Sequence, residues 1–462
     1  MQISAVTKNI ELVSKAYTRI ALIEKGTEQM VRDADAVTLH IVSGKLSKVT
    51  PRTLRTLVRS VVQSAKKHKL EKIVLELEYA SFPKCHTYTE EWFWSTVAEN
   101  ILLADYEYTV YKSTKHPKVL TEVLFAVAEK KVADEGMKRG IIVGTQANIC
   151  RDLANTPGGD MTPSIFANKT KKLFVGTKAK VTVLDLKAIQ KLKMGGLLGV
   201  GQGALDAPKF VIVEYYGDKK SVAPVVFVGK GVTFDTGGLQ VKPGMAMYEM
   251  HMDMSGGAAV VASIAAIAEL KLKKNVIGLV PVAENAIGDK AMRPGDVLTM
   301  MSGATVDVLH TDAEGRLILA DALHYARKYN PKLVVDVATL TGAALAAVGT
   351  HANVIMTKSR KLEDTLRDLG EESGDYVFPL PLWNEYKQYI KGVHGDIANI
   401  PAGDSKSGGS INGGTFLAHF TKKMKWVHID MAPRMTSVGS DKLAKGAAGE
   451  PVRLLVKIAE AY

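Results

Sequence analysis

Cysteine is scarce in this chain of 462 residues. Only Cys85 and Cys150 occur, and they form no Cys-x-x-Cys pair. A disulfide scaffold and a zinc site made of cysteine thiolates are therefore excluded. Such low use of cysteine is typical of a reducing compartment, and we expect both thiols to be structural.

Long hydrophobic runs are absent too. No stretch approaches the roughly 18 uninterrupted apolar residues of a membrane-spanning helix, so we expect no membrane association. Segment 1–26 has no compact apolar core followed by a small-residue cleavage site, which argues against secretion. Glu11 and Glu24 are unusual for an organelle transit peptide. We expect a cytoplasmic protein, with an organelle matrix as the alternative.

Two widespread catalytic signatures are missing as well. The chain has no His-Glu-x-x-His sequence, the metal-binding motif of one class of zinc peptidases. The run "GKG" at 229–231 lacks the GxxxxGK[ST] pattern of a phosphate-binding P-loop. A chemistry based on either motif is therefore excluded.

Positive charge is in excess, with 60 Lys and Arg against 48 Asp and Glu, a net charge of +12. The excess is spread along the chain apart from "KKHK" at 66–69, whereas a nucleic-acid footprint is normally concentrated. A nucleic-acid partner is thus the weaker expectation, although a basic oligomer could have such an affinity as a secondary property.

Short apolar runs alternate with helical patterns along the whole chain, which predicts an α/β protein. Residues 121–154 have a long helical pattern, and "TPGGDMTP" at 156–163 cannot continue it. We predict a smaller N-terminal α/β domain over 1–130, a linker helix over 131–152, and a larger C-terminal catalytic domain over 153–462 with a mixed sheet between helices.

In the larger part, continuous apolar runs predict strands buried on both faces, and ligands of such sheets gather beyond the carboxyl ends of the strands. The predicted strands are 223–229, 275–284, 304–311 and 332–340, and the predicted helices are 256–272, 317–329 and 342–349.

Acidic and basic residues collect at the ends of these elements. Four carboxylates in one place repel each other unless cations balance them, and two divalent ions would do so. A metal pair activates water against a carbonyl or phosphoryl centre, and oxygen ligands favour Mn²⁺ or Mg²⁺, with Zn²⁺ as a further option. Taken singly, an acid at a helix start is more simply a cap. The set consists of Lys230, Asp235, Lys242, Asp253, Asp312 and Glu314.

Three blocks resemble, in sequence and order, the leucyl aminopeptidase family of two-metal exopeptidases. They are "VGKGVTFDTGGLQVKP" (228–243), "DMSGGAA" (253–259) and "TDAEGRLILADAL" (311–323), of which "TDAEGRL" is the family signature. The resemblance continues through "NTPGGDMTP", "VDVATLTGA" and "WVHIDMA" and covers roughly residues 153–462.

The resemblance implies two divalent metal ions per subunit. Asp235 and Glu314 would bridge them, and Asp312 would complete the first site. Asp253 and Lys230 would complete the second, which also receives the free α-amino group of the substrate. Lys230 must then bind as a neutral amine, and a neighbouring dication can lower its pKa enough.

The resemblance also implies the remaining chemistry. Lys242 would stabilise the oxyanion of the tetrahedral intermediate, and Arg316 would hold a bicarbonate ion that acts as general base. The expected activity is release of leucine or another apolar N-terminal residue from peptides by a homohexamer. The substrate pocket would be lined by Met250, Thr339, Gly342, Ala432 and Met435.

The chain departs from the family pattern at two places. His310 stands where the family has asparagine, and we interpret it as a support for Asp312 rather than as a metal ligand. Pro433 and Arg434 stand where small apolar residues are usual, which bears on the preferred N-terminal residue. The competing hypotheses are a nucleic-acid-binding or scaffold protein and a two-metal phosphoesterase.

Overall fold

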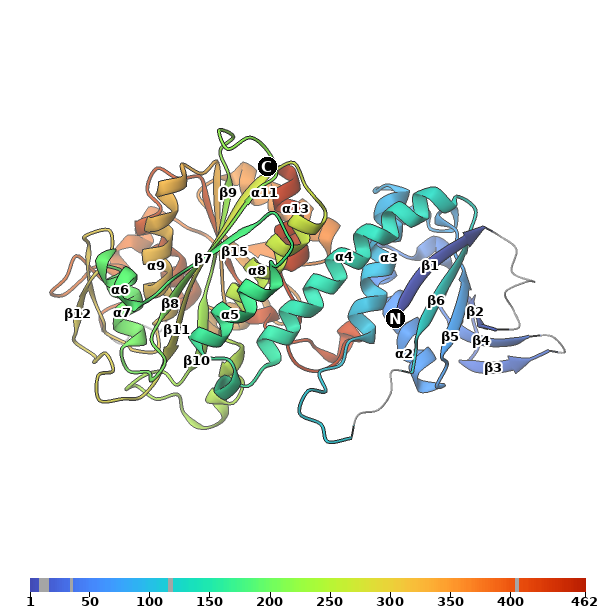
Figure 1. The fold of residues 1–462 in the computed structure, drawn as a ribbon, viewed down its shortest axis with the longest axis horizontal. Coiled ribbons are helices and arrows are strands. Elements are labelled where there is room, and N and C mark those ends of the chain that lie inside the picture. The colour runs from blue at the N-terminus through green and yellow to red at the C-terminus, as the bar shows by residue number, and fades with distance from the viewer. Residues whose placement is uncertain (8–15, 34–35, 115–118, 404–406) are drawn as a thin grey trace. The chain divides into compact units, whose positions relative to one another are not determined.

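The computed structural model describes residues 1–7, 16–33, 36–114, 119–403 and 407–462 and divides into two compact units (Figure 1). The first unit comprises Met1–Asn148 and Ser437–Lys445, and the second comprises Ile149–Thr436 and Gly446–Tyr462. Helix α4 (Lys130–Asn155) begins in the first unit and ends in the second. The domain limits of 1–130, 131–152 and 153–462 stay a prediction.

The first unit is an α/β layer around one sheet. Within its described residues the strand order is β1-β6-β5-β2-β4-β3, and all pairs are parallel except β3 with β4. Its elements are β1 (Gln2–Thr7), β2 (Thr18–Ile23), β3 (Gln29–Arg32), β4 (Val37–Val42), α2 (Pro51–Lys67), β5 (Lys72–Glu76), α3 (Glu90–Asp105) and β6 (Glu122–Val127).

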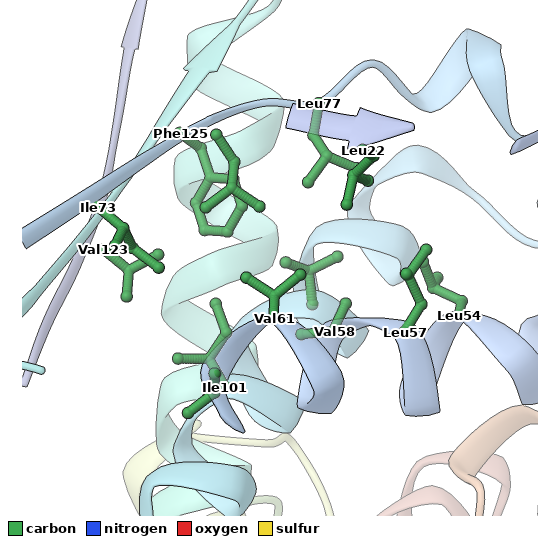
Figure 2. Close-up of a pocket in the computed structure, with 13 residues that line it drawn as sticks. Leu22, Leu54, Leu57, Val58, Val61, Ile73, Leu77, Ile101, Val123 and Phe125 are labelled. Atoms are coloured by element: carbon green, nitrogen blue, oxygen red, sulfur yellow. The ribbon is translucent and has the colours of Figure 1, made fainter. Parts of the chain in front are cut away.

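The core of this unit is filled by its own side chains. Figure 2 shows Val58 and Val61 of α2 lining the same space as Val123 and Phe125 of β6. The space left between these apolar side chains is about 10 Å³, hardly more than one water molecule occupies. This cavity is a packing gap and has no polar group with which to hold a ligand.

Strand β6 corrects the predicted helical segment 121–154, because residues Glu122–Val127 pair with β1 and β5 and only Lys130–Asn155 is helical. A short apolar run has no period that separates a buried strand from a helix. The neighbouring strands decide its conformation.

The second unit has a sheet of nine strands with the order β16-β15-β18-β14-β9-β11-β8-β7, and β10 pairs with β11. The central pairs are parallel, whereas β8 with β11, β7 with β8, and β15 with β18 are antiparallel. The strands are β7 (Lys180–Leu184), β8 (Lys209–Tyr216), β9 (Val225–Gly229), β10 (Gly231–Asp235), β11 (Asn275–Asn285), β14 (Leu333–Ala338), β15 (Asn353–Met356), β16 (Val377–Pro379) and β18 (Trp426–Asp430).

Helices cover both faces of this sheet, α9 with α7 on one and α8 with α13 on the other (Figure 1). A second, small sheet is formed by β12 (Val297–Thr299), β13 (Thr305–Asp307) and β17 (Ile397–Ala398). Its strand order is β12-β13-β17. The predicted mixed sheet between helices is confirmed. The helices are α5 (Pro163–Leu173), α6 (Leu186–Lys191), α7 (Gly195–Gly201), α8 (Ser255–Glu269), α9 (Gly315–Ala326), α10 (Gly342–Val348), α11 (Arg360–Ser373), α12 (Gly409–Phe420) and α13 (Val452–Ala461).

One apolar stretch lies in the middle of this unit. Within the described part of the chain, Gly244–Glu269 is long and apolar enough to cross a membrane by length and composition alone. Most of it is α8, and 89% of its most apolar window is buried inside the protein. The stretch is thus accounted for as a core helix that packs on β9, β11 and β14.

Candidate active site

Lys230 lies between β9 and β10, at the carboxyl end of a central parallel strand. Its backbone N–H donates to the carbonyl of Val337 in β14 at 2.9 Å, and its carbonyl accepts from the N–H of Gly257 in α8 at 2.7 Å. Its ammonium group donates to Asp253 Oδ1 at 2.8 Å and to the carbonyl of Thr339 at 3.0 Å. Two strands and a helix therefore hold this side chain in place.

A second lysine and two carboxylates lie around the end of β10. Asp235 Oδ1 accepts from the N–H of Gly237 at 2.9 Å and from Asn285 Nδ2 at 2.8 Å. The ammonium of Lys242 lies 2.8 Å from Asp235 Oδ2 and 2.5 Å from Asp312 Oδ1. Asn285, at the end of β11, was not identified from the sequence, because a lone asparagine carries no motif.

The predicted metal-binding side chains thus converge. Carboxylate oxygens of Asp235, Asp312 and Glu314 lie within 4.8 Å of one another. Glu314 is also joined to the other half of the cluster, since its Oε1 lies 2.9 Å from the ammonium of Lys230. Four carboxylates and two ammonium groups leave two negative charges uncompensated in a largely buried place. This is the charge imbalance that divalent cations correct.

Burial and this surplus charge shift the pKa values of the cluster. Burial, together with Asp235, raises the pKa of Glu314, and burial with the same neighbour raises the pKa of Asp312 to about 6. Burial lowers the pKa of Lys230, but the surrounding carboxylates outweigh burial and raise it above its ordinary value. Lys230 is thus an ammonium group without metal, and a dication beside it is needed to remove its proton.

The donor set fits divalent cations. Among the described residues, Glu314 Oε2 is buried and has no hydrogen-bond partner. Asp253 Oδ2 lies 2.7 Å from the Lys230 ammonium, yet this contact and that of Glu314 Oε1 lack hydrogen-bond angles. Buried carboxylate oxygens without a well-aligned donor are costly, and a cation satisfies them.

Gly315 is required by close packing at this place. A Cβ atom at Gly315 would lie 2.4 Å from Cε and 2.7 Å from Nζ of Lys230. The residue begins α9 in ordinary helical conformation, so its role is to let Lys230 approach Glu314 and not to permit an unusual turn.

His310 supports the loop that carries Asp312. Its Nδ1 accepts a hydrogen bond from the backbone N–H of Asp312 at 3.1 Å, the bond that an asparagine side chain makes in an Asx turn. Burial, Lys242 and Arg316 lower the pKa of His310, which favours the neutral ring that this bond needs. The structure agrees with the interpretation of His310 as a support.

Asn399 holds the same loop from a distant part of the chain. Its Oδ1 accepts from the N–H groups of Leu309 and His310, at 2.8 and 3.2 Å. Its Nδ2 donates to the carbonyls of His310 and Ala313, at 2.6 and 3.4 Å, and its own carbonyl accepts from Arg316 Nη1 at 2.6 Å. Sequence reasoning missed this residue because it lies far from the signature block.

Replacing Asn399 by alanine is expected to weaken the binding of a divalent cation at this cluster about 10–100-fold, the usual effect of removing a group that orients metal ligands. The measurement is a calorimetric titration of the chelator-treated protein with Mn²⁺. Asn168→Ala, on the exposed side of α5, is the matched control. An unchanged Mn²⁺ affinity of Asn399→Ala would show that the loop holds its shape without this side chain.

Four of the five predicted substrate-pocket residues follow the ends of β14 and β18, namely Thr339, Gly342, Ala432 and Met435. Thr339 donates to Asp253 Oδ1 at 2.6 Å, so it also orients a carboxylate of the cluster. Asp430, which the sequence did not suggest, accepts from the N–H groups of Leu340 and Ala432, at 3.1 and 3.2 Å. These bonds tie together the two segments that carry Gly342 and Ala432.

The two methionines of the predicted pocket lie on different segments of the larger unit. Met250 is half-buried in a short 3₁₀ turn packed against β10, and Met435 is half-buried directly after the turn Ala432–Arg434. Arg434 is directed into the core, where Glu450 Oε1 accepts from its Nε at 2.9 Å and its Nη2 at 2.7 Å. Its charge is thus neutralised inside the protein.

Comparisons with known proteins agree with this arrangement. The model of the "Cytosol aminopeptidase family, catalytic domain" matches residues 148–456, and that of the family's N-terminal domain matches residues 39–115. A protein named "Probable cytosol aminopeptidase" from Alkalilimnicola ehrlichii is 45% identical over 344 residues, 74% of this chain and 68% of that protein. Its namesake from Paraburkholderia phymatum is 41% identical over 370 residues, 79% of this chain and 72% of that protein.

Solved structures show the same fold. The structure "Bottromycin maturation enzyme BotP in complex with Mn" has a TM-score of 0.85 and 29% sequence identity, and the match covers 97% of this chain and 99% of that one. A second structure, "Bottromycin maturation enzyme BotP", has the same TM-score of 0.85 and 30% sequence identity. The match covers 99% of this chain and 98% of that one.

The fold and the matched catalytic domain define the class of protein, a metal-dependent aminopeptidase. Within this class, the chain belongs to the cytosol aminopeptidase family. The resemblance that rested on three short blocks is thereby confirmed.

Proposed function

We propose that this protein releases leucine and other apolar N-terminal residues from peptides, with two divalent metal ions per subunit. One observation carries the proposal. Asp235, Asp312 and Glu314 meet within 4.8 Å, and Asp253 joins them through Lys230. A set of oxygen ligands with one lysine suits Mn²⁺ or Zn²⁺, with Mg²⁺ as a further option.

The ligands divide into two sites in this proposal. Asp235 and Glu314 would bridge the ions, Asp312 would complete one site, and Asp253 with Lys230 would complete the other. Bound there, the two cations would polarise the scissile carbonyl and activate a water molecule as nucleophile. The second site would also take the free α-amino group, which accounts for cleavage at the N-terminus only.

Lys242 and Arg316 would act on the reacting groups. The Lys242 ammonium is positioned by Asp235 and Asp312, and it would stabilise the negative charge that develops on the carbonyl oxygen. Arg316 is buried, and among the described residues its Nε has no partner. Burial lowers the pKa of Arg316 to about 10, so the guanidinium stays positive at neutral pH and can hold a bicarbonate ion as general base.

An apolar side chain suits the proposed pocket. Among the described atoms, none lies within 4 Å of a Cβ built on Gly342, so this wall has open space in front of it. Met250, Ala432 and Met435 would add adaptable apolar surface, which favours leucine or methionine at the cleaved end. Because Arg434 is paired with Glu450, it brings no charge that would change this preference.

Hydrolysis of leucyl-p-nitroanilide after chelation tests the proposal, with Mn²⁺, Zn²⁺ or Mg²⁺ restored one at a time. Activity should return with metal, vanish in Asp312→Ala and be absent with an N-acetylated substrate. Methionyl, lysyl and glutamyl substrates compare the apolar preference with a charged one. Equal turnover of all four would contradict the pocket, and no turnover with any metal would contradict the proposed reaction.

The proposed role of Arg316 in holding bicarbonate can be tested separately. Arg316→Met should lower kcat about 10²-fold, the scale of a positioned general base. Activity of the parent protein in degassed buffer should rise when bicarbonate is added, whereas the variant should not respond. A variant that is slow but still stimulated by bicarbonate would assign the anion to another residue.

The relatives' names indicate a cytosolic setting, and we propose a cytoplasmic homohexamer. Sedimentation of the purified protein tests the hexamer.

The competing hypotheses are tested separately. Hydrolysis of p-nitrophenyl phosphate would support the phosphoesterase alternative. The charge, spread along the chain, gives no further support to a nucleic-acid-binding role.

A further inference from the structure

A pocket with charged residues in its lining lies in the larger unit. It contains none of the proposed metal-binding, catalytic or substrate-pocket residues. Its volume is about 390 Å³, within the range of small-molecule sites. It is bounded by the 3₁₀ helix η8 (Asn384–Ile390), by the C-terminal half of α12 and by the segment that leads into α11.

Four lysines line this pocket and come from three separate parts of the chain. Lys387 and Lys391 belong to η8 and its end, Lys422 follows α12, and Lys358 precedes α11. All four are exposed, and within the part of the chain that the structure describes their ammonium groups make no ion pair or hydrogen bond. The fold therefore gathers four cations that none of the described residues pairs with.

The acid in the pocket does not neutralise them. Asp396 lines it, but its Oδ2 accepts hydrogen bonds from the N–H and Oγ1 of Thr305, at 2.8 and 3.0 Å. Four lysines against one aspartate leave a charge of +3 around the cavity. Like charges that are held together without a partner repel each other, so an anion in the pocket would be favourable.

The rest of the lining is largely apolar and aromatic, with Gln388, Thr415 and His419 as its uncharged polar members. Leu382, Ile390 and Ile397 are buried beneath the lysines. Trp383 lies at the edge with 63% of its surface exposed, although tryptophan is among the residues that are usually covered. The indole is stacked with Tyr386, at 5.9 Å between ring centroids, and a flat ring can extend this stack on the exposed surface of the indole beside the lysines.

We propose that this pocket binds a small molecule that carries two or more phosphate groups. Lysine ammonium groups bind phosphate as point charges, and a di- or triphosphate carries about as many negative charges as the pocket has in excess. Two ligand classes share this chemistry: an inorganic oligophosphate, held by the lysines alone, and a nucleoside polyphosphate, whose base would lie on Trp383.

The pocket is adjacent in the chain to Asn399, which holds the loop that carries Asp312. Asp396 and Ile397 line the pocket, while Ala398 pairs with Asp307 in β13 and Asn399 holds the loop at His310. An occupied pocket would thus restrain the residues next to Asn399. The binding proposal is independent of the proposed peptidase function.

Isothermal titration calorimetry at constant ionic strength tests whether the pocket binds phosphate groups. Tripolyphosphate and ATP are titrated into the full-length protein. The double variant Lys387→Gln/Lys391→Gln should bind at least tenfold more weakly than the parent. Lys187→Gln/Lys191→Gln removes two exposed lysines at the same spacing on α6 and should bind like the parent. Both variants keep the proposed metal ligands, so heat from metal chelation is the same in each.

Trp383→Ala separates the two ligand classes. If it weakens ATP but not tripolyphosphate, the ligand is a nucleoside polyphosphate, and if it changes neither, phosphates alone are recognised. Lys422→Gln, on a different element, replaces the double variant if the latter does not fold. Absence of binding by the parent, or equal binding by the pocket variants and the α6 control, would overturn the proposal.

Discussion

Replacing Glu314 by glutamine is expected to lower the hydrolysis of leucyl-p-nitroanilide about 10³-fold. In the proposed site this carboxylate would help to hold both cations, and losing several kcal/mol of charge stabilisation at about 1.4 kcal/mol per factor of ten would give this scale. Metal content measured by mass spectrometry should fall below two ions per subunit. The backbone of Glu314 also starts α9, since its carbonyl accepts from the N–H of Leu317 at 2.9 Å, and glutamine leaves this bond intact.

The same variant should not lose stability without metal. Removing one of four carboxylates reduces the uncompensated charge from two to one, and burial already disfavours the ionised form of Glu314. The midpoint of thermal unfolding in a chelator should therefore equal or exceed that of the parent. Glu363→Gln on α11, outside the cluster, should keep full activity. If Glu314→Gln kept activity within a factor of about three, Glu314 would not be a metal ligand.

Replacing Glu450 by alanine is expected to destabilise the larger unit by about 3–5 kcal/mol, the usual cost of removing one partner of a buried ion pair. Glu450 accepts two hydrogen bonds from Arg434 and one from Asn353 Nδ2 at 3.1 Å. The guanidinium of Arg453 lies 3.8 Å away and is paired with Asp375 at 2.5 Å. Without Glu450, the buried guanidinium of Arg434 loses the carboxylate that accepts from its Nε and Nη2, whereas Arg453 keeps Asp375.

Urea denaturation followed by tryptophan fluorescence measures this effect. Asp364→Ala is the control, because its partner Arg360 is 79% exposed and Asp364 itself is 51% exposed. Exposed pairs of this kind contribute about 0.5 kcal/mol or less. A loss below about 1 kcal/mol in Glu450→Ala would mean that water reaches the arginines once the carboxylate is gone.

Motif blocks made the convergence of carboxylates and lysines predictable. Lys230, Asp235 and Lys242 lie in one block, and Asp312, Glu314 and Arg316 lie in another, so their spacing is a property of the sequence. The continuous apolar strands that place these blocks at one edge of a sheet were equally visible. Local periodicity failed for Glu122–Val127, where a short apolar run fits helix and strand alike.

The residues that position the site could not be predicted. Asn285, Asn399 and Asp430 each act through hydrogen bonds to segments far along the chain, and a single polar residue carries no local pattern. The pairing of Arg434 with Glu450 could not be predicted either. From the sequence alone, the charge of Arg434 was therefore taken to affect the preferred N-terminal residue of the substrate.

The sequence by itself determined the α/β alternation, the charged residues of each motif block and the glycines that let them approach. The tertiary structure alone decided which side chains meet. Asn399 meets the loop that carries Asp312, Glu450 meets Arg434, and four lysines meet around one pocket. The physical reason is that period and spacing describe neighbours along the chain, whereas burial, charge and hydrogen bonding depend on neighbours in space. Ser437–Lys445 shows this most simply, because these residues belong to the first unit while the chain on either side belongs to the second.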